Sequence, residues 1–315
     1  MIDEHELVKY IDEYKKNHYG KECVVDGYLF KPLENIPSKK GKEEENRNGF
    51  LVYSQETIKN TKNTDLKNLF KNVNIGNEDN IFRYYYYEKL NSSSNLHATI
   101  IMINPAFADS EEPDPTINNI KEFLNNLDKE SKFSSFDIVN LYPVRMPKTA
   151  KLKLYLDETK KETEDYQAFV KSYLNPVCEK DTTKNSEEGD KDENIIIAAW
   201  GSNARDNKTA RELFNGNICK LYCYGMTAGK CPKHFSSLSY NDENQYCHLV
   251  PYLEIEDWLI ILGTTNLSSF DKDNLKKTWN LIKWLDATDM NHKFIQHHKT
   301  VLAKIKEFCK EKNIQ

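Results

Sequence analysis

Long apolar runs are missing from this chain. It begins Met1-Ile2-Asp3-Glu4-His5 without a hydrophobic signal segment, and no stretch is apolar enough to span a bilayer. Its seven cysteines, an odd number, are scattered along 315 residues, which is not typical of a disulfide framework. We therefore expect a soluble protein of the reducing cytoplasm, with no membrane partner.

Several nucleotide-binding and hydrolase motifs are also missing. The sequence has no Gly-Lys-Ser/Thr phosphate loop, no glycine-rich dinucleotide fingerprint and no nucleophile elbow. These absences argue against an NTPase, a dehydrogenase and a serine hydrolase. A formal charge of −5 and a pI near 6.0 exclude a generally basic surface, but they are compatible with one basic face that binds nucleic acid.

Paired metal ligands are not evident either. Cys219 and Cys223 are four residues apart on a predicted strand, which separates them by about 13 Å and prevents them from sharing a zinc ion. Cys231 and His234 would supply two ligands, but no second pair has suitable spacing. We predict no metal and no cofactor.

Four apolar segments indicate buried strands, namely 98–103, 136–141, 194–199 and 218–224. Helical spacing of apolar residues separates them, as in Ile117, Ile120 and Leu124. This alternation predicts an α/β fold, a three-layer α/β/α arrangement with a mostly parallel central sheet.

Changes in composition divide the chain into three parts. Residues 1–79 form an N-terminal α+β extension, in which Asp26-Gly27 between two apolar runs indicates a hairpin. Residues 80–250 form the α/β core domain, with a polar, mobile insertion at about 178–193. Residues 251–315 are helical, with apolar stripes that dock on the core or bind a partner.

Polar or backbone-permissive residues follow each of the four strands: Asn104-Pro105, Asn140 to Arg145, Trp200 to Asn203, and Gly225 to His234. Because the carboxyl ends of parallel strands meet at one edge of a sheet, these segments predict a single site there.

Four residues of these segments and of the loop after Asn104 are candidates for catalysis. Asn104 would position water or a ligand amide, or it is a turn residue before proline. Asp114 would orient water, or it caps the following helix. Asp109 competes for the same role and has no capping context. His234 would stabilise a leaving anion, or it lies on the surface of a flexible loop.

Other residues of these segments suit binding. Asn140 offers a donor and an acceptor to a base edge, or it merely ties down a loop. A phosphate would sit on the helix that Ser202 opens, although capping explains Ser202 equally well. A local basic rim would include Arg145, Lys230 and Lys233, unless these are simply solvated charges.

Residues 80–240 resemble the bacterial and phage family catalogued as domain of unknown function 1643. The resemblance rests on these motifs, which occur in the family's order: Ile103-Asn104-Pro105, Asp109, Asp114-Pro115-Thr116, Val139-Asn140-Leu141-Tyr142, Ala199-Trp200-Gly201, Gly225-Met226-Thr227 and Pro232-Lys233-His234. The chain departs from it at Ala106-Phe107, where the family usually has Ser-Thr, so no serine role is carried over. The family's link to phages implies a role in anti-phage defence or in phage biology.

More remotely, the same order resembles the uracil-DNA glycosylase superfamily. Its members have a strand-end Asn-Pro or Asp-Pro beside the water and base, and a late histidine loop beside the leaving base. Asn104 matches the first and His234 the second, although Ala106 and Phe235-Ser236-Ser237 depart from the superfamily's pattern.

The resemblance implies a DNA glycosylase-like hydrolase that cleaves the N-glycosidic bond of a modified or damaged base extruded from DNA. Asn140 would read the base edge, and Phe107 or Tyr142 would stack on the base, although Phe107 is equally well a core residue. Phosphates would be held by Ser202, Thr227 and Lys230. The alternative is a noncatalytic nucleic-acid or nucleotide binding module with the same cleft.

Overall fold

The structure is a computed structural model of the whole chain. It describes residues 3–17, 20–36, 46–55, 81–90, 94, 96–105, 115–127, 133–145, 152, 156, 160–179, 194–201, 209–210, 212–213, 221–225, 227, 231–238, 249–252, 303, 306–307 and 310–311.

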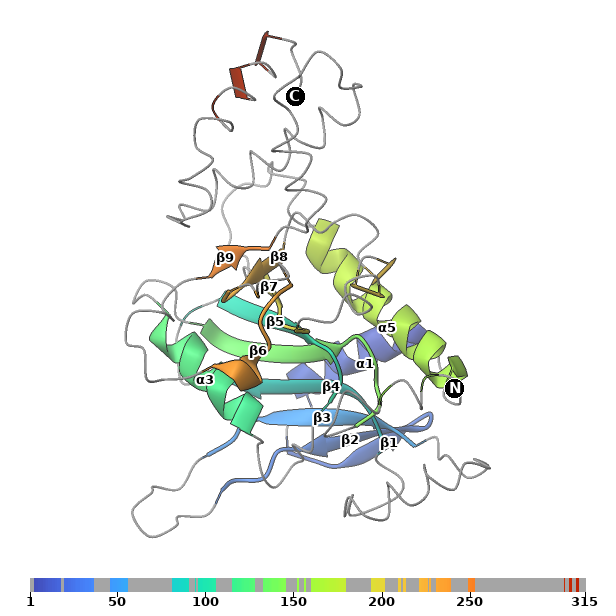
Figure 1. Ribbon diagram of the computed structural model, residues 1–315. Coiled ribbons are helices and arrows are strands. Elements are labelled where there is room, and N and C mark those ends of the chain that lie inside the picture. Colours follow the sequence, from blue (N-terminus) through green and yellow to red (C-terminus); the bar gives the residue numbers. More distant parts are fainter. Residues whose placement is uncertain are drawn as a thin grey trace, which may run out of the picture.

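The described strands form one nine-stranded sheet in the order β1-β2-β3-β4-β6-β5-β7-β8-β9 (Figure 1). Their bounds are β1 Cys23–Val25, β2 Tyr28–Pro32, β3 Gly49–Ser54, β4 Phe82–Lys89, β5 Leu96–Met102, β6 Phe133–Asn140, β7 Asn194–Ala198, β8 Leu221–Cys223 and β9 Val250–Pro251. The hairpin predicted at Asp26-Gly27 is confirmed between β1 and β2. Asp26 and Gly27 have φ of 47° and 90°, the left-handed backbone that the tightest hairpin turns require.

The four strands predicted for the core are confirmed, and they pair in parallel as β6-β5-β7-β8. The prediction of a mostly parallel sheet is nevertheless wrong for the sheet as a whole. Its other five neighbouring pairs, β1-β2, β2-β3, β3-β4, β4-β6 and β8-β9, are antiparallel. Parallel pairing occurs where the crossover helices α3 and α5 separate strands in the sequence. The error arose because the strands of the N-terminal extension join the core sheet through β4.

Helices cover both faces of this mixed α/β sheet (Figure 1). One face packs against α1, Glu4–Asn17, and α5, Lys160–Glu179, and the other against α3, Pro115–Asn126, and the short helix η5, Phe235–Ser237. Side chains alternate between the two cores along each strand, so that Ile101 belongs to the first and Ile100 to the second.

The strands of the predicted extension 1–79 thus belong to the same sheet as those of the core domain. Helix α5 reaches Glu179, and the rest of the insertion predicted over 178–193 lies outside the described residues. The helices predicted over 251–315 also lie largely outside them.

Candidate functional site at the carboxyl edge of the sheet

The carboxyl ends of the four parallel strands lie at one edge of the sheet. This follows from their registers, in which Met102 of β5 lies beside Asn140 of β6, and Ile101 beside Ala198 of β7. The segments that continue from them remain joined, because the Tyr142 amide donates to the Ile103 carbonyl at 3.0 Å. The carboxyl ends of these strands therefore meet at one edge, as predicted.

Two asparagines at this edge are buried. Asn104 is 5% exposed, and its Nδ2 donates to the Pro105 carbonyl at 3.1 Å. Asn140 is 1% exposed, and its backbone amide donates to the Tyr166 hydroxyl of α5 at 2.6 Å. Its side-chain Oδ1 is buried without a hydrogen-bond partner among the described residues. A buried amide oxygen of this kind costs free energy unless a water or ligand satisfies it.

His234 is held on a rigid platform. It precedes η5, and its Nδ1 accepts a hydrogen bond from the Ser236 amide at 3.1 Å. The neutral imidazole therefore carries its proton on Nε2, which is a hydrogen-bond donor. The Tyr224 hydroxyl donates to the His234 carbonyl at 2.7 Å, and Asn119 of α3 donates to the Phe235 carbonyl at 2.8 Å.

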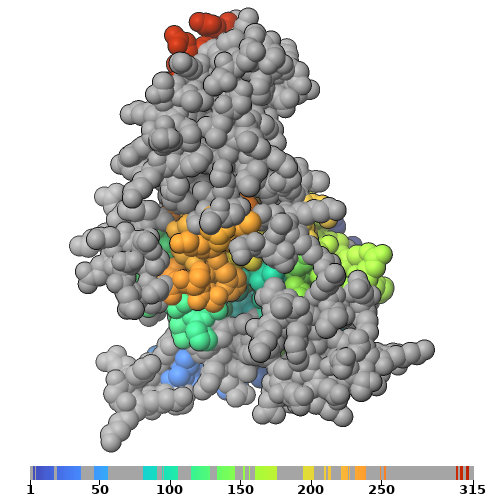
Figure 2. Space-filling view, viewed as in Figure 1, coloured from blue at the N-terminus to red at the C-terminus, as the bar shows by residue number. Residues whose placement is uncertain are grey.

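The platform is anchored by one aromatic side chain. Phe235 is fully buried, with ring centroids 5.4 Å from Phe123 of α3 and 4.9 Å from Tyr224. Gly201, at the end of β7, approaches His234 closely, since a Cβ at Gly201 would lie 3.8 Å from the His234 Cβ. The segment that carries His234 lies at the surface beside α3 (Figure 2).

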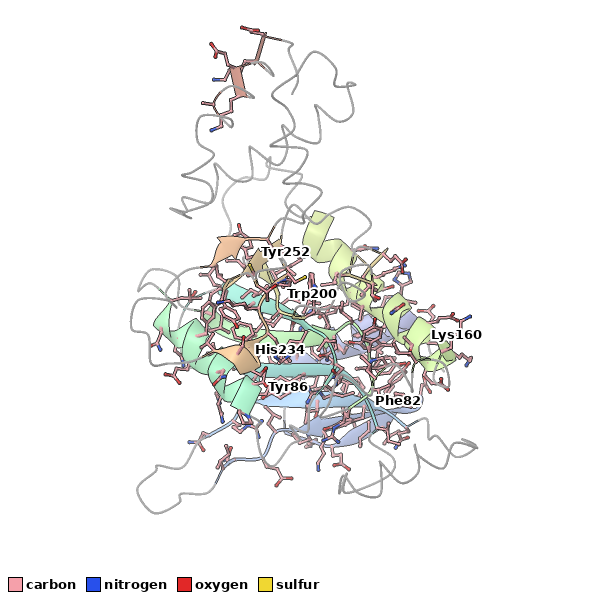
Figure 3. The ribbon with its side chains drawn as sticks, viewed as in Figure 1. Phe82, Tyr86, Lys160, Trp200, His234 and Tyr252 are labelled. Atoms are coloured by element: carbon pink, nitrogen blue, oxygen red, sulfur yellow. The ribbon has the colours of Figure 1, made fainter. Side chains whose placement is uncertain are left out.

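The Trp200 and Tyr252 rings pack edge to face where they follow β7 and β9, with centroids 5.3 Å apart (Figure 3).

Burial raises the pKa of the Cys223 thiol on β8 to about 12. This thiol is therefore protonated near neutral pH and is not a nucleophile.

Two predicted binding residues are more buried than their roles suggested. Tyr142 is 3% exposed, and its hydroxyl lies 2.9 Å from the Thr209 hydroxyl. Arg145 is 6% exposed, with its guanidinium 5.6 Å from the centroid of the Tyr53 ring. Both side chains contribute to the packing behind this edge of the sheet.

Two further predicted residues line the loop after β8. The Thr227 amide donates to the Cys231 carbonyl at 2.8 Å, and the Thr227 hydroxyl accepts from the Cys231 amide at 3.2 Å. Lys233 donates its amide to Gly225, and its side chain lies against that glycine. The Thr227 hydroxyl thus bonds to the backbone of the same loop. Lys233 directly precedes His234 in the sequence.

Five predicted site residues lie outside the described residues: Phe107, Asp109, Asp114, Ser202 and Lys230. The helix expected after Asp114 does begin at Pro115. Its periodic residues Ile117, Ile120 and Leu124 are buried as predicted.

The sequence motifs did not indicate Arg83. It is 1% exposed on β4, and its guanidinium lies 5.7 Å from the centroid of the Tyr86 ring. Because β4 is antiparallel to β6, the start of β4 lies at the same edge, where the Arg83 amide donates to the Pro143 carbonyl at 3.0 Å. The sequence did contain one signal, which is an arginine within a run of strand-forming aromatic residues. A buried arginine is rarely found without a partner for its charge.

Residues 83–234 match the model of a family described as a protein of unknown function (DUF1643). The family resemblance expected from the sequence motifs is thus confirmed over this segment. The match begins on β4, ends at His234 and includes all four parallel strands. Neither a curated protein nor a solved structure matches the chain significantly.

Across the part of the chain that the structure describes, no helix is both long and apolar enough to cross a membrane. The same residues contain no group of three or more His, Cys, Asp or Glu side chains arranged to hold a metal ion.

Proposed function

We propose that this protein is a DNA glycosylase-like hydrolase that cleaves the N-glycosidic bond of a modified or damaged base, in anti-phage defence. The fold proposed to carry this activity is the three-layer arrangement of the uracil-DNA glycosylase superfamily, extended by antiparallel strands. The phage connection and the superfamily rest on the sequence resemblance.

The observation that carries the proposal is the buried side chain of Asn140, with its Oδ1 unpartnered among the described residues. An extruded base is recognised by hydrogen bonds to its edge inside a dry pocket. An amide oxygen that is buried at the ligand-binding edge of an α/β sheet fits that task.

His234 would supply the second requirement, which is stabilisation of the charge that develops on the departing base. Its neutral form donates from Nε2, because Nδ1 is occupied by the Ser236 amide. A fixed donor needs no reorganisation during the reaction, and this makes its electrostatic stabilisation effective. Asn104 with Asp109 or Asp114 would position the attacking water, and Phe107 would stack on the base.

Phosphates would be bound at the rim by Ser202, Thr227, Lys230 and Lys233. The Arg145 side chain is buried, so Arg145 would attract the phosphates through its positive charge.

The test is incubation of the protein with modified DNAs, including phage DNAs that carry hypermodified bases, followed by alkaline cleavage at abasic sites. We expect strand breaks that require the protein. Asn140→Ala should abolish these breaks. Asn194→Ala should not, because Asn194 is the first residue of β7, away from the carboxyl edge, and bonds Thr99. The absence of abasic sites on every substrate would refute the proposal.

One observation favours a second candidate, a noncatalytic binding module. Among the described residues that directly follow β5, β6, β7 and β8, none is a carboxylate, and base excision needs a group that activates water. This candidate predicts that DNA or a nucleotide binds, that Asn140→Ala weakens binding, and that no abasic site forms.

A further inference from the structure

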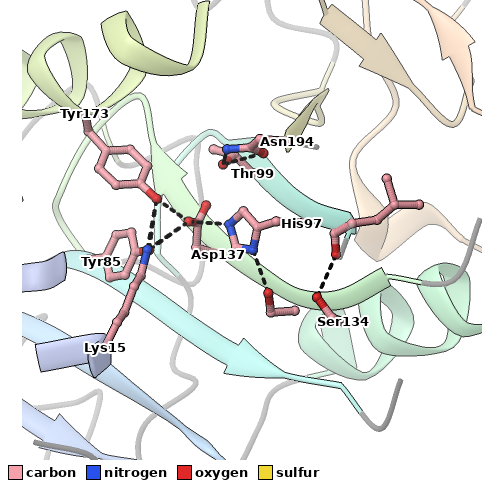
Figure 4. A network of polar contacts seen from close by, with 10 residues as sticks. Lys15, Tyr85, His97, Thr99, Ser134, Asp137, Tyr173 and Asn194 are labelled. Atoms are coloured by element: carbon pink, nitrogen blue, oxygen red, sulfur yellow. Dashed lines mark hydrogen bonds and ion pairs between the residues drawn. The ribbon is translucent and has the colours of Figure 1, made fainter. Parts of the chain in front are cut away.

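A buried polar network joins α1, the sheet and α5 near the middle of β6 (Figure 4). Its centre is Asp137 on β6, whose carboxylate is fully buried. Asp137 Oδ2 accepts hydrogen bonds from Tyr85 at 2.7 Å and from His97 Nε2 at 2.8 Å, and it also accepts from the Tyr173 hydroxyl. His97 Nδ1 in turn lies 2.8 Å from the Ser135 hydroxyl.

Lys15 of α1 also contacts this network. Its Nζ lies 3.8 Å from Asp137 Oδ2 and 3.4 Å from the Tyr173 hydroxyl. The same nitrogen lies over three aromatic rings, 5.2 Å from the centroid of Tyr85, 5.1 Å from Tyr87 and 5.6 Å from Tyr173. One ammonium group is therefore enclosed by three tyrosine faces and one carboxylate.

This arrangement is the chemistry that selects alkylammonium ions. The face of a tyrosine ring attracts a cation within about 6 Å, most strongly where water is excluded. Burial raises the pKa of Tyr85 and Tyr173, so both stay neutral and donate to Asp137. The Asp137 carboxylate then supplies a negative charge 3.8 Å from the ammonium nitrogen, and Asp12 of α1 adds a second negative charge nearby.

The four cage residues and Lys15 come from different parts of the chain. Tyr85, Tyr87, Asp137 and Tyr173 all lie within the segment 83–234 that matches the family, whereas Lys15 lies outside it. We propose that these four side chains form an alkylammonium-binding site, which Lys15 occupies as an internal ligand that fastens α1 to the family segment. The site is independent of the proposed glycosylase activity, since none of the residues assigned to that activity belongs to this network.

The test is chemical rescue of Lys15→Ala in the full chain. This substitution removes three methylene groups and the ammonium, which together correspond to n-propylammonium. Hydrogen exchange of the α1 amides should accelerate about tenfold in the variant, in line with the loss of a desolvated cation–π contact. Added n-propylammonium should slow it again saturably, whereas uncharged 1-propanol of similar shape should not.

Lys16→Ala is the matched control, because Lys16 is exposed on the same helix. It should change neither the exchange nor the response to n-propylammonium. Equal protection by 1-propanol and n-propylammonium, or protection by neither, would overturn the proposal.

A second experiment covers the case in which Lys15→Ala fails to fold. Lys15→Met keeps most of the apolar stem, and Tyr87→Leu removes one cage wall while retaining an apolar side chain. In a double-mutant cycle we expect coupled effects on α1 exchange, because the two residues contact each other. Additive effects would contradict an ammonium site.

Discussion

The middle of β6 and its carboxyl end use buried polar groups differently. In the middle, Asp137 is surrounded by donors from three other elements, and Lys15 balances its charge. At the carboxyl edge, the Oδ1 of Asn140 is buried without a partner among the described residues. The Oδ1 of Asp137 is also buried without a hydrogen-bond partner among the described residues. Its Oδ2, however, accepts the hydrogen bonds from Tyr85, His97 and Tyr173 that hold the carboxylate in place.

This difference separates a structural cluster from a candidate ligand site. A buried carboxylate with several donors rigidifies the elements that supply them. A buried neutral amide with an unsatisfied oxygen stabilises nothing by itself, and a ligand that reaches it gains a hydrogen bond. Substitutions at Asp137 and its partners should therefore change stability, and substitutions at the carboxyl edge should change activity.

The largest effect is expected at His234. His234→Ala should lower the single-turnover rate of base excision by about 100-fold or more, because it removes a preorganised donor to the leaving base. Thermal unfolding should change little, since Phe235 retains the η5 platform. Ser236→Ala keeps the imidazole and should retain most of the rate. A loss of stability that matches the loss of activity would instead assign His234 a structural role.

Asp137→Asn should have the largest effect on stability. It removes the charge that faces Lys15 and His97, and breaking a buried ion pair costs about 3 kcal/mol or more in the free energy of unfolding. Urea denaturation measures this loss. Glu13→Gln is the control, because Glu13 is exposed on α1; similar losses for the two variants would contradict the assignment.

Acid should weaken the contacts of Asp137. Burial alone raises the pKa of Asp137, but the charge and hydrogen bond of His97, with Lys15 and Tyr173, lower it from 3.8 to about 2. The folded state thus favours the ionised form, which stabilises the protein above pH 4 and loses this effect as pH falls toward 2.

The expected loss is about 2 kcal/mol in the free energy of unfolding between these pH values. The charged and titratable groups that face Asp137 are Lys15 of α1, Tyr85 and Tyr87 of β4, His97 of β5 and Tyr173 of α5. Denaturation as a function of pH measures the loss, and Asp137→Asn should remove this part of the pH dependence. An unchanged slope in the variant would contradict it.

The smallest effect is expected at Gly201. Its φ is +92°, which side chains rarely adopt, so Gly201→Ala should cost about 1–2 kcal/mol of stability. The new methyl group would also contact the Cβ of His234. Gly225→Ala is the control, because its Cβ would make an ordinary contact with Lys233. Calorimetry that gives equal costs at both glycines would refute the role of backbone conformation.

Local patterns predicted the elements that depend on nearby residues. The run from Ala98 to Ile103 became β5, Asp26-Gly27 became a hairpin, and Pro115 begins α3. These features depend on hydrophobic burial, turn geometry and fixed proline φ, each of which acts over a few residues. The convergence of strand ends was also predictable, because crossover helices impose parallel pairing.

Long-range contacts were not predictable in this way. No local pattern indicates that β6 lies between β4 and β5, or that Arg145 lies over Tyr53 instead of facing solvent. The cage joins Lys15 to Tyr173 across 158 residues. Within its own segment, Lys15 resembles any lysine of a helix, and Tyr85 and Tyr87 resemble the aromatic residues of any strand.

The sequence by itself determined the strands, most of the crossover helices and the edge at which polar residues gather, because these follow from short-range periodicity and chain connectivity. The tertiary structure alone decided which polar groups are satisfied. Asn140 and Asp137 are three residues apart on one strand, and each contacts a tyrosine of α5, Tyr166 and Tyr173 respectively. Their neighbours from distant segments supply several donors to the Oδ2 of Asp137 and leave the Oδ1 of Asn140 without a partner among the described residues.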